Sequence, residues 1–170
     1  MTKSEIRSIV LSKLKLTKNA ILFDIGAGTG SIAIEAARQI PDGRVYAIER
    51  NPDGLDLIKE NSLKLQADNL TIVSGTAPEC LDTLPAATHA FIGGSGGHLK
   101  EIMQLLYSCN PEIRIVITAI TLETISQIMT LQKEMSLPEP EIVQLQVSSA
   151  KKAGPYHLMQ GQNPVYIVSF

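Results

Sequence analysis

The chain has 170 residues, of which 44% are hydrophobic and 19% charged, and its formal net charge is -2. These values are typical of one globular domain, and a chain of this length buries about 70% of its unfolded surface, so a small disulfide-stapled or metal-stapled scaffold is excluded. The longest basic run is Lys151-Lys152, so a nucleic-acid partner is not expected.

The first segment, residues 1–19, is predicted to be an amphipathic helix. Apolar residues at Ile6, Val10 and Leu14 have helical spacing, and Thr2 with Glu5 three residues later has the pattern of a capping box. Charged residues interrupt the apolar positions, which argues against a signal peptide, and no apolar run approaches 18 residues. The sequence therefore predicts a cytoplasmic protein with no membrane partner.

Residues 20–137 alternate between short apolar runs and stretches with helical spacing. Alternation of this kind predicts a parallel sheet, because parallel neighbours need crossover connections, and the crossover helices cover both faces. The fold class is therefore α/β, with a doubly wound sheet. The expected strands are 20–25, 44–49, 70–74, 88–93 and 113–119, and the expected helices are 31–40, 52–65, 78–81, 97–107 and 122–135.

The pattern changes in residues 138–170. Two strand-like stretches, 141–149 and 165–170, are expected to pair antiparallel at the end of the sheet. Residues 150–164 between them are rich in Gly, Pro, Lys and His, and they are expected to form a functional or flexible loop. All three segments are assigned to a single domain, residues 1–170.

The most informative motif is Asp24-Ile25-Gly26-Ala27-Gly28-Thr29-Gly30, between the first expected strand and the first helix. A glycine turn before a helix N-terminus suits an anionic or nucleotide ligand, and Glu49 at the end of the next strand suits a ribose diol. The G-x-G-x-G spacing favours S-adenosylmethionine over NAD, whose binders use G-x-G-x-x-G. A plain tight turn is the alternative for the glycines. For Asp24, the alternatives are a charge partner of the helix N-terminus and a role near the cofactor's amino group.

A second glycine cluster, Gly93-Gly94-Ser95-Gly96-Gly97, follows the fourth expected strand, which lies beside the first in a doubly wound sheet. Small residues there leave space for a large flat acceptor, although a flexible loop before a helix is the alternative. Cys80 and Cys109 are 29 positions apart with no Cys/His cluster around them, so no metal site is expected.

Taken together, six segments resemble the decarboxylating precorrin methyltransferases of vitamin B12 biosynthesis. The glycine turn is common to many methyltransferases, whereas the Gly-Gly-Ser-Gly-Gly loop combined with Ala-Ile-Glu-Arg-Asn-Pro is far more specific. The resemblance covers nearly the whole chain. The segments are 24–30, 45–52, 75–79, 91–97, 116–119 and 163–165.

The resemblance implies a Rossmann-like class I S-adenosylmethionine-dependent methyltransferase that is a homotetramer. It implies methylation of carbon 15 of a precorrin-6B-type tetrapyrrole and loss of the carboxyl group from the acetate on carbon 12. The stand-alone length resembles the enzyme of the cobalt-first route, whose substrate is cobalt-precorrin-6B. The cofactor contacts that it implies are Thr2, Gly26, Ala27, Gly28, Thr29, Gly30, Glu49 and Ala77.

The chain departs from relatives at Thr76, where a carboxylate that could accept the adenine amine is common, and at His89, where Asp is common. A tetrapyrrole carries many carboxylates, so nearby cations and small residues are candidate substrate contacts. A methyltransferase for another small molecule and an inactive cofactor-binding partner are the alternative functions. The substrate candidates are Gly93, Gly94, Ser95, Gly96, Gly97, His98, Lys151 and Lys152, with His157 as a further cation and Tyr156 and Met159 as possible ring covers.

Overall fold

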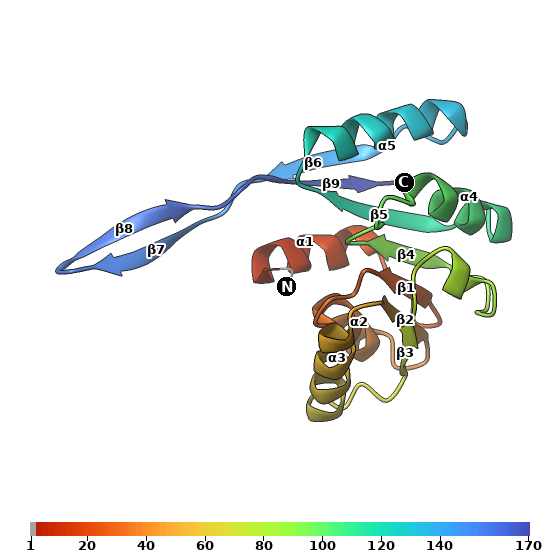
Figure 1. The fold of residues 1–170 in the computed structure, drawn as a ribbon, viewed down its shortest axis with the longest axis horizontal. Coiled ribbons are helices and arrows are strands. Elements are labelled where there is room, and N and C mark those ends of the chain that lie inside the picture. The colour runs from red at the N-terminus through yellow and green to blue at the C-terminus, as the bar shows by residue number, and fades with distance from the viewer. Residues whose placement is uncertain (1–2) are drawn as a thin grey trace.

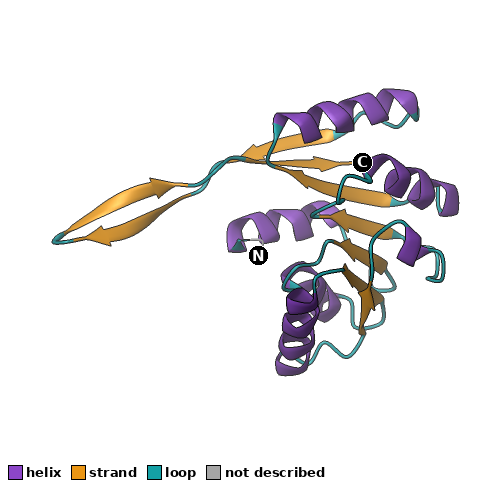
Figure 2. Cartoon of the chain, in the orientation of Figure 1, coloured by secondary structure: helices purple, strands orange, loops and turns teal. Residues whose placement is uncertain are grey.

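The computed structural model describes residues 3–170, and its helices and strands alternate along most of the chain (Figures 1 and 2). None of the helices within residues 3–170 is both long and apolar enough to cross a lipid bilayer. The helices are α1 (Ser4–Leu14), α2 (Ser31–Gln39), α3 (Pro52–Lys64), the 3-10 turn η1 (Glu79–Leu81), α4 (Leu99–Cys109) and α5 (Leu122–Glu134). The strands are β1 (Ile21–Ile25), β2 (Arg44–Glu49), β3 (Leu70–Ser74), β4 (His89–Ile92), β5 (Arg114–Ala119), β6 (Glu141–Leu145), β7 (Ser148–Ala153), β8 (Tyr156–Gly161) and β9 (Val165–Ser169).

Seven strands form one sheet in the order β3-β2-β1-β4-β5-β9-β6. Strands β1 to β5 are parallel to their neighbours, whereas β9 is antiparallel to both β5 and β6. Strand β1 pairs with β2 on one side and with β4 on the other, so the order in which successive strands are added to the sheet reverses beside β1. In doubly wound sheets this switch point is where ligands bind, beyond the carboxyl ends of the strands. The predicted α/β class and the adjacency of the first and fourth strands are confirmed.

The sheet buries both of its faces because successive side chains along a strand point in opposite directions. In β1, Leu22 belongs to the core under α1, α2 and α3, while Phe23 belongs to the core under α4 and α5. Both side chains are at most 3% exposed. This double burial explains the nearly continuous apolar runs from which the sequence predicts these strands.

The N-terminal helix is present, but its predicted cap is displaced. Helix α1 begins at Ser4, and its N-cap is Lys3, which makes no side-chain capping hydrogen bond. The expected capping box of Thr2 with Glu5 is therefore wrong in position, and Thr2 itself lies outside the described residues. Ile6, Val10 and Leu14 are buried as the spacing predicts.

The C-terminal segment confirms the antiparallel pair and corrects the loop between its strands. Strand β6 pairs with β9, but residues 141–149 do not form one strand, and residues 150–164 are not an irregular loop. Instead β7 and β8 form a hairpin, with Ser148 opposite Gly161 and a turn at Gly154, whose φ is +61°. We call residues 148–161 the arm. All residues of its two strands are exposed, and the arm extends away from the sheet (Figure 1).

Candidate functional site

The glycine turn Gly26–Gly30 connects β1 to α2 at the switch point of the sheet. Its three glycines all have left-handed φ angles, between 58° and 75°, a region that other residues occupy at a cost. The N–H groups of Gly26 and Ala27 both donate to the carbonyl oxygen of Ile48 in β2, at 3.0 Å each. The turn is thereby fastened to the neighbouring strand.

Glu49, the last residue of β2, presents its carboxylate to this turn. Its Oε2 accepts from the N–H of Gly28 at 2.8 Å, and its Oε1 accepts from the N–H groups of Arg50 and Asn51 at 2.9 and 2.8 Å. Three of the roughly four acceptor positions of a carboxylate are thus used, and about one remains for a ligand hydroxyl. Gly54 of α3 leaves room for this side chain, because a Cβ there would lie 2.9 Å from Glu49 Cγ.

Asp24 lies behind the turn and is only 1% exposed. Its Oδ2 accepts from the N–H of Ala33 in the first turn of α2 at 2.9 Å. One carboxylate oxygen of Asp24 is therefore a partner of the helix N-terminus, which is the first of the two predicted alternatives. Its Oδ1 is buried and has no hydrogen-bond partner among the described residues. Burial, reinforced by the charge of Glu49 and opposed by the Ala33 hydrogen bond, raises the pKa of Asp24 to about 7. A role of Asp24 near the cofactor's amino group stays a prediction.

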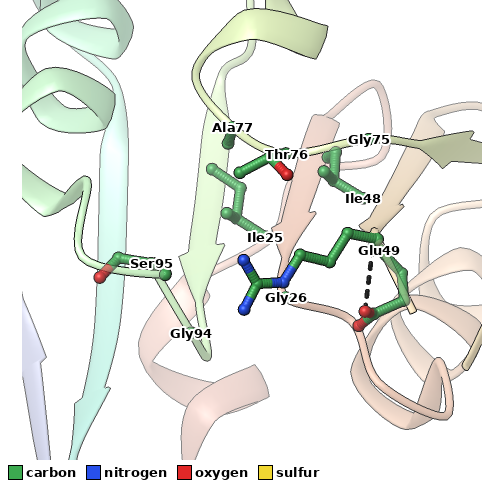
Figure 3. A pocket seen from close by; sticks show the side chains of 11 residues that line it. Ile25, Gly26, Ile48, Glu49, Gly75, Thr76, Ala77, Gly94 and Ser95 are labelled. Atoms are coloured by element: carbon green, nitrogen blue, oxygen red, sulfur yellow. Dashed lines mark hydrogen bonds between the residues drawn. The ribbon is translucent and has the colours of Figure 1, made fainter.

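Two cavities open at this end of the sheet. The first, which we call the Glu49 cavity, has a volume of about 260 Å³, and Figure 3 shows Glu49 on one side of it with Gly94 and Ser95 on the opposite side. It is lined by Ile25, Gly26, Ile48, Glu49, Arg50, Gly75, Thr76, Ala77, Gly94, Ser95 and Gly96. The second, which we call the Lys3 cavity, has a volume of about 490 Å³. It is lined by Lys3, Ile6, Gly26, Ala27, Gly28, Gly93, Thr118, Ile120, Val147, Gln162, Asn163 and Val165.

The two glycine clusters touch where these cavities meet. Gly26 lines both cavities, and a Cβ on it would lie 2.7 Å from the carbonyl oxygen of Gly94. The second cluster is divided, since Gly93 lines the Lys3 cavity while Gly94–Gly96 line the Glu49 cavity. A ligand that occupied both cavities would therefore pass this backbone contact, and the loop predicted to face an acceptor also faces the nucleoside side.

Most of the predicted cofactor residues converge on this pair of cavities. Ala77 is 4% exposed and lies on the wall of the Glu49 cavity. Thr29 and Gly30 complete the turn but line neither cavity, and Thr29 lines a separate cavity beside Ser31 and Asn61. The substrate candidates are more dispersed. His98 is the exposed N-cap residue of α4, whereas Lys151 and Lys152 lie on the arm and line neither cavity of their own chain. Their substrate role stays a prediction, as do those of His157, Tyr156 and Met159 on β8.

Several lining residues were missed by the sequence analysis. Arg50 follows Glu49 directly within the motif that carries the resemblance, so its position beside the site could have been noticed. Lys3, Ile120 and Asn163 come from loops far apart in the chain, and only the strand order brings them together. Asn163 lies in segment 163–165, which contributes to the resemblance but was given no site role, whereas no local pattern marks Lys3 or Ile120.

Neither cysteine lines the Glu49 cavity or the Lys3 cavity. Cys80 and Cys109 are both free, and burial raises the pKa of the Cys80 thiol. Within residues 3–170, no three His, Cys, Asp or Glu side chains are grouped so that they could hold a metal ion.

Comparison with known proteins gives matches over the whole chain. A family model described as a precorrin methyltransferase domain matches residues 1–170. The chain is 39% identical to a probable cobalt-precorrin-6B C(15)-methyltransferase (decarboxylating) of Pyrobaculum calidifontis, over 99% of this chain and 87% of that protein. It is 38% identical to the cobalt-precorrin-6B C(15)-methyltransferase (decarboxylating) of Salmonella typhimurium, over 99% and 88%.

A solved structure agrees with these matches. The crystal structure of precorrin-6y C5,15-methyltransferase from Geobacter metallireducens superposes with a TM-score of 0.93 at 39% identity, over 99% of this chain and 89% of that one. The similarity therefore extends through both glycine clusters and both cavities.

Proposed function

Because the chain belongs to the precorrin methyltransferase family, we propose that it methylates carbon 15 of cobalt-precorrin-6B and removes the carboxyl group of the acetate on carbon 12. The methyl donor is S-adenosylmethionine, and the product is cobalt-precorrin-7 of cobalamin biosynthesis. The observation that carries the proposal is the meeting of the Glu49 and Lys3 cavities at the glycine turn, in a chain that the family model matches over its full length.

The residues of the Glu49 cavity fit the donor. The free acceptor position on Glu49 suits a ribose hydroxyl, and the apolar walls at Ile48 and Ala77 suit a nucleobase. The unpartnered Oδ1 of Asp24 lies behind the turn that would carry the amino-acid part. When bound, S-adenosylmethionine supplies an electrophilic methyl group on a sulfonium.

The Lys3 cavity is the proposed place of the acceptor. Lys3 offers a cation and Asn163 an amide to the substrate's carboxylates, while Ile6 and Ile120 offer apolar surface to the ring. The ring carbon is already electron-rich, so the chain's contribution is alignment rather than a strong base. The macrocycle accepts the electrons released by decarboxylation. Apolar side chains that keep water from the departing carboxylate favour its neutral product.

The test is an assay with cobalt-precorrin-6B and labelled S-adenosylmethionine. The product should gain about 14 mass units from the methyl that replaces hydrogen and lose about 44 as carbon dioxide, with both changes arising in one aligned complex. Glu49→Ala removes a charged acceptor worth about 1.5–3 kcal/mol. Calorimetry should show its affinity for S-adenosylhomocysteine reduced about 10-fold to 150-fold, and both mass changes should fall together.

Other products would lead to other conclusions. A methylated product that keeps its acetate would leave a methyltransferase without the decarboxylating step. If cofactor binds but no methyl reaches any corrinoid precursor, the acceptor is another small molecule or the chain is an inactive partner. Preference for NAD over S-adenosylhomocysteine would overturn the cofactor assignment.

We also propose that residues 1–170 form a single domain, that the protein is cytoplasmic and that it is a homotetramer. The arm supports self-association, because an isolated two-stranded hairpin is marginally stable in water. Its strand β8 exposes three large apolar side chains, Tyr156, Leu158 and Met159, at 71%, 60% and 68%. A surface of this kind on an extended arm is suited to contact with other copies of the chain.

Replacing these three side chains with Ser is expected to convert the tetramer into smaller species, because it removes the apolar surface of the arm. The measurement is light scattering after size exclusion, in which the unchanged protein should have about four times the 18.4 kDa chain mass. The matched control replaces Leu63 and Leu122, which are 73% and 75% exposed on α3 and α5, and should leave the mass unchanged. A monomeric unchanged protein, or an arm variant that remains tetrameric, would contradict the proposal.

A further inference from the structure

Arg50 reaches from the end of β2 across the mouth of the Glu49 cavity. Its side chain is one of the cavity walls, together with Thr76 and Ala77. On the far side it approaches the glycine loop, since its Nη1 and Cζ lie 3.6 and 4.0 Å from the position of a Cβ on Gly96. The guanidinium therefore lies beside Gly96, at a distance that a Cβ there would meet as ordinary van der Waals contact.

The guanidinium has no protein partner in the part of the chain that the structure describes. The ion pairs there are Arg7 with Glu35, Lys13 with Glu141 and Lys100 with Glu134, none of which includes Arg50. Its neighbour Glu49 is held by backbone N–H groups, one of them that of Arg50 itself. The guanidinium of an exposed arginine is normally hydrated or forms an ion pair with a carboxylate. The guanidinium of Arg50 instead lines a cavity, where its donors are available to a ligand.

The chemistry of the guanidinium determines which contacts Arg50 can make with a nucleobase in this cavity. A guanidinium has only donors, so it cannot pair with an exocyclic amine, but its flat face stacks well on an aromatic ring. Thr76, which lines the same cavity, is uncharged, and its side chain ends in a hydroxyl. Arg50 is therefore the planar cation beside the space proposed for the base.

We propose that Arg50 is a cofactor-binding residue that recognises the adenine by its face: the guanidinium stacks on the ring and closes the cavity against Gly96. The inference rests on the proposed function, because it takes the Glu49 cavity to be the nucleoside site. It adds a residue that acts on the aromatic surface of the base rather than on its hydrogen-bonding edge.

The experiment is isothermal titration of two ligands, S-adenosylhomocysteine and its inosine analogue, which carries a carbonyl in place of the exocyclic amine. Arg50→Met keeps the length of the side chain and removes its plane and charge. The variant should bind both ligands about fivefold more weakly, the size expected of one cation–π contact, with the ratio between the ligands unchanged. Arg50→Lys keeps the charge without the plane and should lie between the variant and the unchanged protein.

Arg44→Met is the matched control, since Arg44 is exposed at the opposite end of the same strand and the change in charge is identical. It should leave both affinities unchanged, and neither variant should alter the melting temperature. If the unchanged protein binds the ligands and Arg50→Met binds them equally well, the inference is overturned while the proposed function stands. A changed ratio between the ligands would replace stacking with a contact to the edge of the base that carries the exocyclic amine. If the unchanged protein binds neither ligand, the proposed function and the inference both fail.

Discussion

Replacing Gly26 with Ala is expected to lower the free energy of unfolding by about 2–6 kcal/mol and to abolish measurable binding of S-adenosylhomocysteine. The left-handed φ of +75° costs about 1–3 kcal/mol in a residue with a Cβ. The added methyl would also lie 2.7 Å from the carbonyl oxygen and 2.9 Å from the nitrogen of Gly94, and such overpacking costs about another 1–3 kcal/mol. The backbone atoms of Gly94 cannot rotate away as a side chain would. The close approach of Gly26 to Gly94, where the two cavities meet, must therefore shift.

Two other glycines separate these causes. Gly28 has a φ of +58° but open space around its Cβ position, so Gly28→Ala should show the conformational cost alone. A Cβ on Gly94 also meets open space, so Gly94→Ala should change stability by less than about 0.5 kcal/mol while placing a methyl in the Glu49 cavity. Urea unfolding measures all three variants. Equal losses for Gly26→Ala and Gly28→Ala would show that the approach to Gly94 carries no cost.

Replacing Asp24 with Asn is expected to remove a pH dependence of stability. In the folded protein the pKa of Asp24 is raised from 3.8 to about 7, so between these pH values the folded state holds a proton that the unfolded state has lost. The resulting stabilisation is fully present below about pH 4, declines as pH rises and is lost above about pH 7. Its total is on the order of 4 kcal/mol.

The measurement is the difference in free energy of unfolding between the unchanged protein and Asp24→Asn, obtained from urea titrations at pH 5 and pH 8. The advantage of the unchanged protein should shrink by about 2–3 kcal/mol over this interval, because Asn keeps an oxygen for the Ala33 N–H and does not titrate. If Asp24 also receives the cofactor's ammonium, binding near pH 7 should release a proton, and the variant should not. A difference in stability that is constant with pH would contradict the raised pKa.

The sheet and the glycine turn could be predicted from the sequence because physical constraints leave a pattern there. Strands such as β4 are buried on both faces, so they appear as apolar runs bounded by turns. Glu49 could be placed because it ends a parallel strand next to β1, and parallel strands bring their carboxyl ends to one side of the sheet. In such segments the position of a residue in the fold determines its type, so the local sequence is enough to predict that position.

The arm could not be predicted because it lacks the burial that gives the sheet its sequence pattern. Strand periodicity arises when one face is buried and the other is not, and the arm buries neither face. Its sequence therefore has no need to alternate, and Gly154 and Lys151-Lys152 look like a loop. Its pairing is held by the backbone ladder, which continues to its base, where the N–H of Gln162 donates to the carbonyl of Val147.

Lys3 and Asn163 in the wall of the Lys3 cavity were not predicted as site residues for a different reason. Lys3 precedes the first helix and Asn163 precedes the last strand, so their proximity depends on β9 entering the sheet beside β5. That insertion is a property of the strand order. Arg50 is exposed, and a single exposed arginine carries no periodic signal.

The arm exposes two unpaired strand edges, which are potential sites of aggregation. Each of its two strands has only one partner, so its outer row of backbone N–H and C=O groups can template a further strand, and nothing in such pairing limits its extent. Lys151 and Lys152 lie next to each other on β7, where like charges oppose the stacking of one hairpin on another. Because salt screens such repulsion, growth into open-ended fibrils should be suppressed at low ionic strength and favoured at high ionic strength.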